Sequence, residues 1–129
     1  MYLVDYHMHS NNSFDSKETV ASVCEAAIVK GIKEICFTEH FSVKEGLKSH
    51  GFLNLKKYSD EIAECRRRFK NELIIRVGLE ICEPHENEEE LKAIIENLPL
   101  DFVLGSIHNI NFNTGFARKK RPNAQGNAI

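Results

Sequence analysis

Four short apolar segments, each followed at once by a histidine or a carboxylate, set the strongest limit on how this chain can fold. The segments and the residues that follow them are 2–6 with His7 and His9, 34–38 with Glu39 and His40, 73–79 with Glu80, and 101–107 with His108. Short apolar runs of this kind are typical of buried strands. Because the carboxyl ends of parallel strands share one edge of a sheet, we expect these side chains to gather at one rim, as in a metallohydrolase.

Helix-like segments separate the four strands, the third of which we extend to residue 81. Apolar positions spaced by three or four residues predict three helices, over 17–30, over 55–69, and from the cap Asn87 to about residue 97. Ser16 is the expected cap of the first helix, and Gly31 supplies the left-handed residue that ends it. The predicted order β-α-β-α-β-α-β is an α/β fold with a parallel sheet, either open or closing into a barrel.

Composition and charge exclude several classes of protein. The chain has 129 residues, 42% of them hydrophobic, which suits one domain with its own core. The formal net charge is -2, so no global basic field favours nucleic acid or an anionic membrane surface. No apolar stretch is long enough to cross a bilayer, and the N-terminus lacks the pattern of a secretory signal. We therefore expect a cytoplasmic protein.

The cysteines agree with that expectation. Cys24, Cys36, Cys65 and Cys82 are scattered along the chain without a C-x-x-C spacing. Each lies in or beside a predicted helix or strand, which predicts buried, reduced thiols. This spacing argues against both a disulfide and a thiolate metal site.

Histidines and a glutamate at the strand ends suggest the chemistry. His7 and His9 are two residues apart in an extended segment, so both imidazoles face the same side and can bind one ion. Imidazole and carboxylate groups suit zinc, manganese and iron. Glu80 is the natural bridging ligand between two cations, with His108 on the second.

A third ion has its own candidate ligands. His40 ends the second strand, and Asp15 lies in the loop after the first, although a loop aspartate also commonly caps a turn or a helix. Glu39 alternates away from His40, toward the helices or into a supporting position. His50 lies in the loop 41–54 over the expected site and is a candidate for substrate contact, whereas His85 has no assigned role.

Four motifs in order resemble those of the polymerase-and-histidinol-phosphatase (PHP) superfamily. They are His7-Met8-His9-Ser10, Thr38-Glu39-His40, Gly78-Leu79-Glu80 and Gly105-Ser106-Ile107-His108. Within that family the residues 2–10, together with the segment that contains Phe52 and Tyr58, are most similar to bacterial histidinol phosphatases. The resemblance covers residues 1–111.

The resemblance implies the N-terminal half of a distorted (βα)7 TIM-like barrel. It implies up to three divalent ions, one held by His7, His9 and Glu80, one by Glu80 with His108, and one by Asp15 with His40. It also implies a phosphatase that hydrolyses L-histidinol phosphate, a small phosphate monoester of histidine biosynthesis, with Glu80 as the central catalytic carboxylate. The alternatives are another PHP phosphoesterase, acting on a nucleotide or phosphotyrosine, and a non-catalytic remnant that binds one metal or a partner chain.

The last part of the chain departs from the family pattern. Residues 112–129 carry the basic cluster Arg118-Lys119-Lys120-Arg121 without apolar periodicity, which predicts a solvated, disordered tail. No later Asp-x-His motif follows, so we expect a truncated product with incomplete metal shells. A half barrel also leaves strand edges open, and apolar side chains facing the missing half predict self-association; those expected there are Val4, Cys36, Val77 and Val103.

Overall fold

The computed structural model describes residues 1–109, and the predicted tail, 112–129, lies outside the described residues. The described chain alternates strands with helices in the predicted order. The elements are β1 (Leu3–Met8), α1 (Val20–Val29), β2 (Ile32–Phe41), α2 (Leu55–Arg68), β3 (Ile74–Cys82), α3 (Glu88–Ile95) and β4 (Phe102–Ser106).

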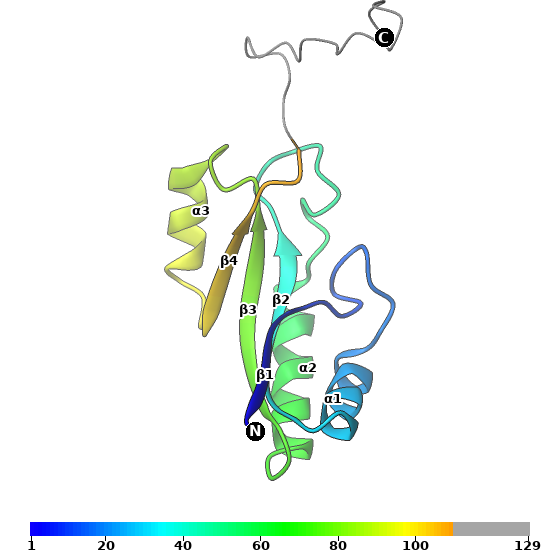
Figure 1. Cartoon of the computed structure of the whole chain (residues 1–129). Coiled ribbons are helices and arrows are strands. Elements are labelled where there is room, and N and C mark those ends of the chain that lie inside the picture. Colours follow the sequence, from blue (N-terminus) through cyan, green and yellow to red (C-terminus); the bar gives the residue numbers. More distant parts are fainter. Residues whose placement is uncertain (110–129) are drawn as a thin grey trace, which may run out of the picture.

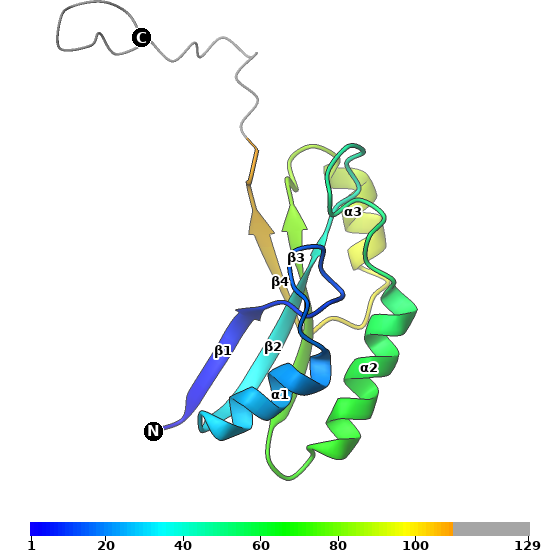
Figure 2. The same ribbon diagram turned by 90° about the vertical axis from the view of Figure 1, so that its right-hand side faces the viewer.

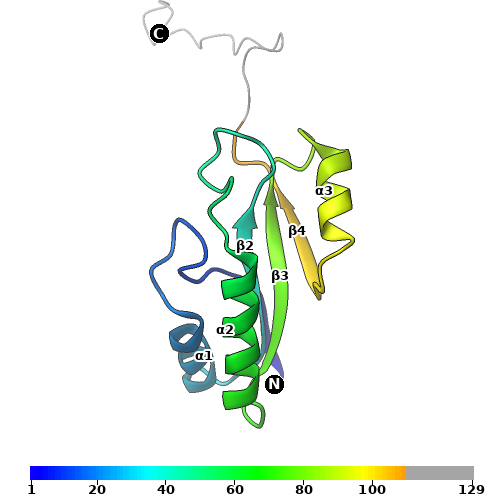
Figure 3. The same cartoon turned by 180° about the vertical axis from the view of Figure 1, so that it is seen from behind.

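All four described strands are parallel and lie in the sheet order β1-β2-β3-β4 (Figure 1). The three helices cover one face of this sheet; seen from behind, α2 lies in front of β2 and α3 lies beside β4 (Figure 3). Figure 2 shows the same layers from the side, with α2 and α3 to the right of the strands. The opposite face of the sheet carries no helix of the described chain.

Two element boundaries differ from the predictions in ways that matter for the site. The prediction that Ser16 caps the first helix is wrong, because α1 begins at Val20 and the Thr19 side chain accepts the Ser22 N–H bond. The second strand runs to Phe41, beyond its expected end at residue 38, so that His40 lies inside β2, whereas Glu80 lies inside β3 as expected. Gly31 has the predicted left-handed conformation, at φ +76°.

The apolar core lies between the sheet and the helices. Side chains of β2 and β3 pack against the inner faces of α1 and α2, and the fully buried members include Ile35, Phe37, Leu79, Cys24 and Ile62. The Tyr58 hydroxyl of α2 bridges the two central strands, at 3.1 Å from the Phe37 carbonyl oxygen and 3.0 Å from that of Gly78. This arrangement joins α2 firmly to the middle of the sheet.

Val77 was expected on the open face, and this prediction is wrong. Val77 packs against the core on the helix side, beside Tyr58 and Ile62. Val103 is in register with the buried Leu79 and so shares that side. Val4, in contrast, is paired with Glu34 on the open face and is 53% exposed.

Gly78 permits the close packing of three strands behind the predicted site. A Cβ atom at this position would meet the Phe102 carbonyl oxygen at 2.7 Å and the Phe37 carbonyl oxygen at 3.1 Å. Only glycine fits there without moving a strand.

The cysteines are buried and unpaired within the described chain, as predicted: Cys24, Cys36, Cys65 and Cys82. Over the same residues, 1–109, no helix has the length and apolar character needed to span a membrane.

Candidate metal centre

The centre of the site is formed where β2 and β3 end. His40 and Glu80 are direct partners in the parallel register of these strands, and both are buried. Side chains of register partners point to the same face of a sheet. Both therefore project from the open face, at the edge to which the strand arrowheads point in Figure 1.

A register irregularity in β1 brings two further histidines to this face. Between Asp5 and Met8 the chain advances three residues, while β2 advances only two, from Ile35 to Phe37. An extra residue of this kind is a bulge, and it changes which side chains point to each face. As a result Met8 packs against the core, whereas His7 turns toward Glu80.

The Glu80 carboxylate is the hub of the cluster. Its Oε2 atom lies 3.2 Å from Nε2 of His7, 3.2 Å from Nε2 of His9 and 3.4 Å from Nδ1 of His40. Its Oε1 atom lies 3.5 Å from Nε2 of His108. Burial alone would raise the pKa of Glu80, but the hydrogen bond with His7 and the charge of His40 lower it below its usual range. The carboxylate is therefore ionised at neutral pH.

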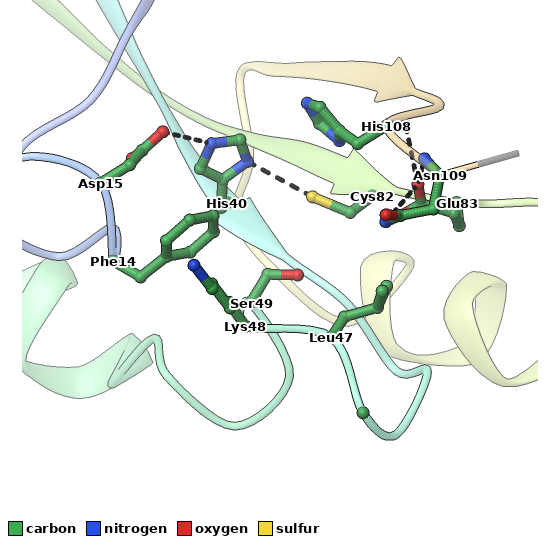
Figure 4. Close-up of a pocket in the computed structure, with 11 residues that line it drawn as sticks. Phe14, Asp15, His40, Leu47, Lys48, Ser49, Cys82, Glu83, His108 and Asn109 are labelled. Carbon is green, nitrogen blue, oxygen red and sulfur yellow. Dashed lines mark hydrogen bonds and ion pairs between the residues drawn. The ribbon is translucent and has the colours of Figure 1, made fainter.

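His40 lies at the crossing point of several contacts. Its Nε2 atom is 3.0 Å from Oδ2 of Asp15, and its ring stacks on that of His9 with centroids 4.3 Å apart. Phe14 stacks on His40 as well, at 5.0 Å. The Sγ atom of Cys82 lies 3.3 Å from Nδ1 of His40 (Figure 4).

These contacts shift the pKa values of three side chains, His40, His9 and Asp15, when no metal is bound. The hydrogen bond with Cys82, helped by Asp15, raises the pKa of His40 to about 9 against the opposing effect of burial. Burial lowers the pKa of His9, and the neighbouring charge of His40 adds to this. Partial burial would raise the pKa of Asp15, but its bond with His40 outweighs this and lowers it. Without metal, then, His40 is protonated at neutral pH and lies next to the carboxylates of Asp15 and Glu80.

A buried glutamate supports the loop that carries His9. Glu39 is fully buried on the helix side and accepts hydrogen bonds from the Ser10 N–H and from the hydroxyls of Ser10 and Ser13. The Ser13 Oγ atom in turn lies 3.3 Å from Nδ1 of His9 and accepts the His40 N–H bond. Through Ser13, Glu39 thus supports the imidazole of His9 and the backbone of His40, which is the supporting position that was one of its two expected roles. Such outer contacts orient ligand histidines in metal sites.

Glu83 holds the chain that follows β4. Its Oε1 atom accepts N–H bonds from His108 at 2.7 Å and Asn109 at 2.8 Å, and one from the Asn109 side chain. Glu83 itself has φ 51°, a left-handed conformation that is uncommon outside glycine and costs about 1–3 kcal/mol. The contacts to residues 108 and 109 hold this strained residue in place and so position His108.

A cavity of about 400 Å³ opens beside the cluster. Asp15, His40, Cys82, Glu83 and His108 line one side, and the loop after β2 lines the other with Leu47, Lys48 and Ser49 (Figure 4). His50, expected to contact substrate, is exposed and is not among the lining residues. His85, which was assigned no role, is exposed, and its Nε2 atom lies 3.7 Å from Oε1 of Glu86.

The six predicted ligands thus come together in overlapping sets. Each set has ligand atoms within 4.8 Å of one another: His7 with His9 and Glu80, His9 with Asp15 and His40, and His40 with Glu80 and His108. A fourth set, Cys82 with Glu83 and His108, was missed, because the cysteine spacing carried no signal. Only the alternation of side chains along β3 from Glu80 could have placed Cys82 on the same face.

A parallel βα sheet with imidazole and carboxylate groups converging at the carboxyl ends of its strands defines an α/β protein with a candidate metal site at one edge of the sheet. Comparison with known proteins narrows this class. The chain is 38% identical over 111 residues to the histidinol-phosphatase of Lactococcus lactis, and 32% identical over 107 residues to a probable histidinol-phosphatase of Clostridium acetobutylicum. These matches cover 85% and 83% of this chain, but 40% of each relative.

A solved structure agrees with the sequence matches. The crystal structure of the Lactococcus lactis histidinol phosphate phosphatase, complexed with zinc, L-histidinol and phosphate, matches with a TM-score of 0.77 at 37% identity. The match covers 84% of this chain and 41% of that one. The chain thus spans about 40% of the length of the relatives that it matches.

The PHP domain model matches residues 5–127. The chain belongs to the PHP domain family. The resemblance predicted from the four motifs is confirmed, and so is the fold, since the four parallel strands with their helices correspond to part of a TIM-like barrel.

Proposed function

We propose that this chain forms the metal-binding part of a phosphatase that hydrolyses L-histidinol phosphate to L-histidinol and phosphate in histidine biosynthesis. The observation that carries the proposal is the convergence of four imidazoles on the two oxygens of the buried Glu80 carboxylate. A buried carboxylate surrounded by imidazoles is a donor set that divalent cations such as zinc favour. The named activity of the relatives supplies the substrate.

The donor set fits up to three divalent ions, zinc, manganese or iron. His7, His9 and Glu80 would hold one ion, Glu80 and His108 a second, and Asp15 with His40 a third. Bound metal would supply Lewis-acid activation of water and neutralise charge on the phosphoryl oxygens. Glu80 is the residue on which these sets depend, because it belongs to two of them.

The chain's own side chains also suit an anionic substrate. A cavity of about 400 Å³ is of the size that holds small molecules. The exposed Lys48 lines it opposite Asp15 and His40 (Figure 4), where its ammonium can bind a phosphate oxygen and orient the ester toward the cluster. Four buried, unpaired cysteines further suit a reducing compartment, and we propose the cytoplasm.

A chimera tests this assignment in a complete barrel. Residues 1–109 of this chain would replace the matching segment of the Lactococcus lactis enzyme, and phosphate release from L-histidinol phosphate would be measured with zinc or manganese added. We expect metal-dependent turnover that is lost in the Glu80→Gln chimera and retained in the matched control Glu89→Gln, which changes an exposed residue of α3.

Two outcomes of that assay would overturn the proposal. A folded chimera that binds metal but releases phosphate equally well from nucleotides and phosphotyrosine would point to a general phosphoesterase. A folded chimera that binds no metal would point to a non-catalytic remnant. Circular dichroism of both chimeras shows whether they are folded.

We propose in addition that the open face of the sheet directs self-association. β1 and β4 are the outer strands of the described sheet, and Tyr2 and Val4 on this face are 61% and 53% exposed. Unpaired strand edges next to exposed apolar groups favour pairing with another copy. Sedimentation velocity should show dimers or larger species whose fraction rises with concentration, and a monodisperse monomer at all concentrations would contradict this.

A further inference from the structure

We propose that Cys82, Glu83 and His108 form a distinct site for a thiophilic divalent cation, zinc in the first instance, next to the Glu80 cluster. Ligand atoms of these three residues lie within 4.8 Å of one another. The site shares His108 with the proposed phosphatase centre, but it requires no hydrolytic activity.

The three side chains come from the ends of two neighbouring strands. Cys82 is the last residue of β3 and Glu83 follows it, while His108 lies just beyond β4. Cys82 and Ser106 are register partners, so the two chain segments run side by side up to the site. Figure 4 shows Cys82 between His40 and Glu83, with His108 next to them on the same side of the cavity.

An unpartnered oxygen on Glu83 points to a ligand here. Glu83 is 3% exposed, and its Oε1 atom already accepts the N–H bonds of His108 and Asn109. Its Oε2 atom is buried and has no hydrogen-bond partner among residues 1–109. A buried carboxylate oxygen without a partner is unfavourable, and such groups call for an ion or a donor that satisfies them. A cation bound between the Cys82 thiolate and His108 would do so.

The donor set differs from that of the Glu80 cluster in containing sulfur. Thiolate ligands favour zinc, cadmium and cobalt over magnesium or manganese, whereas carboxylate and imidazole groups accept all of these. Binding would release the thiol proton of Cys82 to solvent as the metal–sulfur bond forms. The Cys82 site would therefore retain a thiophilic ion such as zinc under conditions in which the Glu80 cluster exchanges zinc for manganese.

Glu83 also has a structural role, and a conservative variant separates the two roles. In Glu83→Gln the amide oxygen can still accept the N–H bonds of residues 108 and 109. The amide nitrogen then takes the place of the free Oε2 atom and cannot bind a cation. The variant thus removes one ligand while keeping the contacts that position His108.

Cadmium titration of the full chain tests the proposal, because a cadmium–thiolate bond has a charge-transfer band in the ultraviolet. We expect this absorption with the parent chain and with two matched controls, Cys24→Ala in the core and Glu89→Gln on the surface. The band should be absent in Cys82→Ala, with about one cadmium equivalent fewer bound. In Glu83→Gln the cadmium affinity of the band should fall about tenfold or more, since even outer partners of metal ligands contribute 10–100-fold.

Each other outcome counts against the site. Cadmium or zinc bound without a thiolate band would refute the Cys82 site while leaving the Glu80 cluster and the proposed phosphatase standing. A band that persists in Cys82→Ala would assign the thiolate to another cysteine. Unchanged cadmium affinity in Glu83→Gln would reduce Glu83 to its structural role, and a chain that binds no metal at all would overturn both proposals.

Discussion

The two faces of the sheet differ in how completely their apolar side chains are buried and their polar side chains are hydrogen-bonded. On the helix side, Phe37 and Leu79 are fully buried, and even the buried Glu39 has its hydrogen bonds filled by serines. On the open side, Val4 and Tyr2 are exposed, and the carboxylate of Glu80 is surrounded by imidazoles.

This difference separates the source of stability from the source of function. The helix face buries apolar area, which is the main favourable contribution to folding. The open face gathers carboxylates and imidazoles that lie close enough together to bind a cation. Changes on the two faces should therefore affect different measurements.

The largest effect on stability is expected from Phe37→Ala on the helix face. Removing this fully buried ring should lower the free energy of unfolding by about 3–5 kcal/mol, whereas Val4→Ala on the open face should lower it by less than about 1 kcal/mol. Urea denaturation followed by circular dichroism measures both. Equal losses in the two variants would show that the open face is packed as tightly as the other.

The next largest effect is on metal affinity, from Glu80→Gln. The amide keeps the shape of the side chain but loses the charge that His7, His9 and His40 surround. Zinc affinity, measured by isothermal titration calorimetry, should fall by more than about 100-fold, the upper range for loss of an outer partner. Glu89→Gln serves as the control and should bind zinc as the parent does. Parent-like zinc affinity in Glu80→Gln would remove Glu80 from the site.

Zinc binding should also depend on pH through His40. Its pKa is raised to about 9 in the metal-free chain, so below that pH the metal must displace a proton. Apparent zinc affinity should therefore rise about tenfold per pH unit from pH 6 to 8, for one proton displaced. Calorimetry in buffers of different ionisation enthalpy counts the protons released, and no release at pH 7 would contradict the assignment.

The smallest effect is expected from Lys48→Gln. Lys48 lines the cavity, whereas Lys44 on the same loop is paired with Glu86 at 2.5 Å and provides the matched control in Lys44→Gln. Binding of inorganic phosphate to the zinc-loaded chain should weaken about tenfold in Lys48→Gln, as for loss of one charge-assisted hydrogen bond at the low end of its range. Equal effects of both variants would indicate a general charge effect.

Much of the fold was predictable because its signals are local. Apolar runs and helical periodicity are set by neighbouring residues, and they predicted all seven elements in order. The capping residue was not predictable, because Ser16 and Thr19 offer the same hydroxyl and only tertiary contacts choose between them. The face of Val77, in contrast, could have been predicted from the alternation over residues 75–81, which places Val77 and Glu80 on opposite faces of the sheet.

The candidate site was predictable as a set of residues but not as a geometry. Histidines and a glutamate at strand ends gave five of the six predicted ligands, because parallel topology brings such positions together, whereas Asp15 came from the loop after the first strand. The bulge between Asp5 and Met8, which turns His7 to the open face, leaves no mark in the sequence. Cys82 and Glu83 were missed for a similar reason, since their importance arises from the neighbouring His108 in space.

Anomalous diffraction at the zinc edge, from crystals of the chain grown with zinc, tests the central claim most directly. The account predicts strong peaks at the open end of β2 and β3, with Glu80 oxygen atoms and histidine nitrogen atoms as ligands. Zinc found only at exposed groups such as His85 and Glu86, with the Glu80 carboxylate still bonded to imidazole alone, would contradict it.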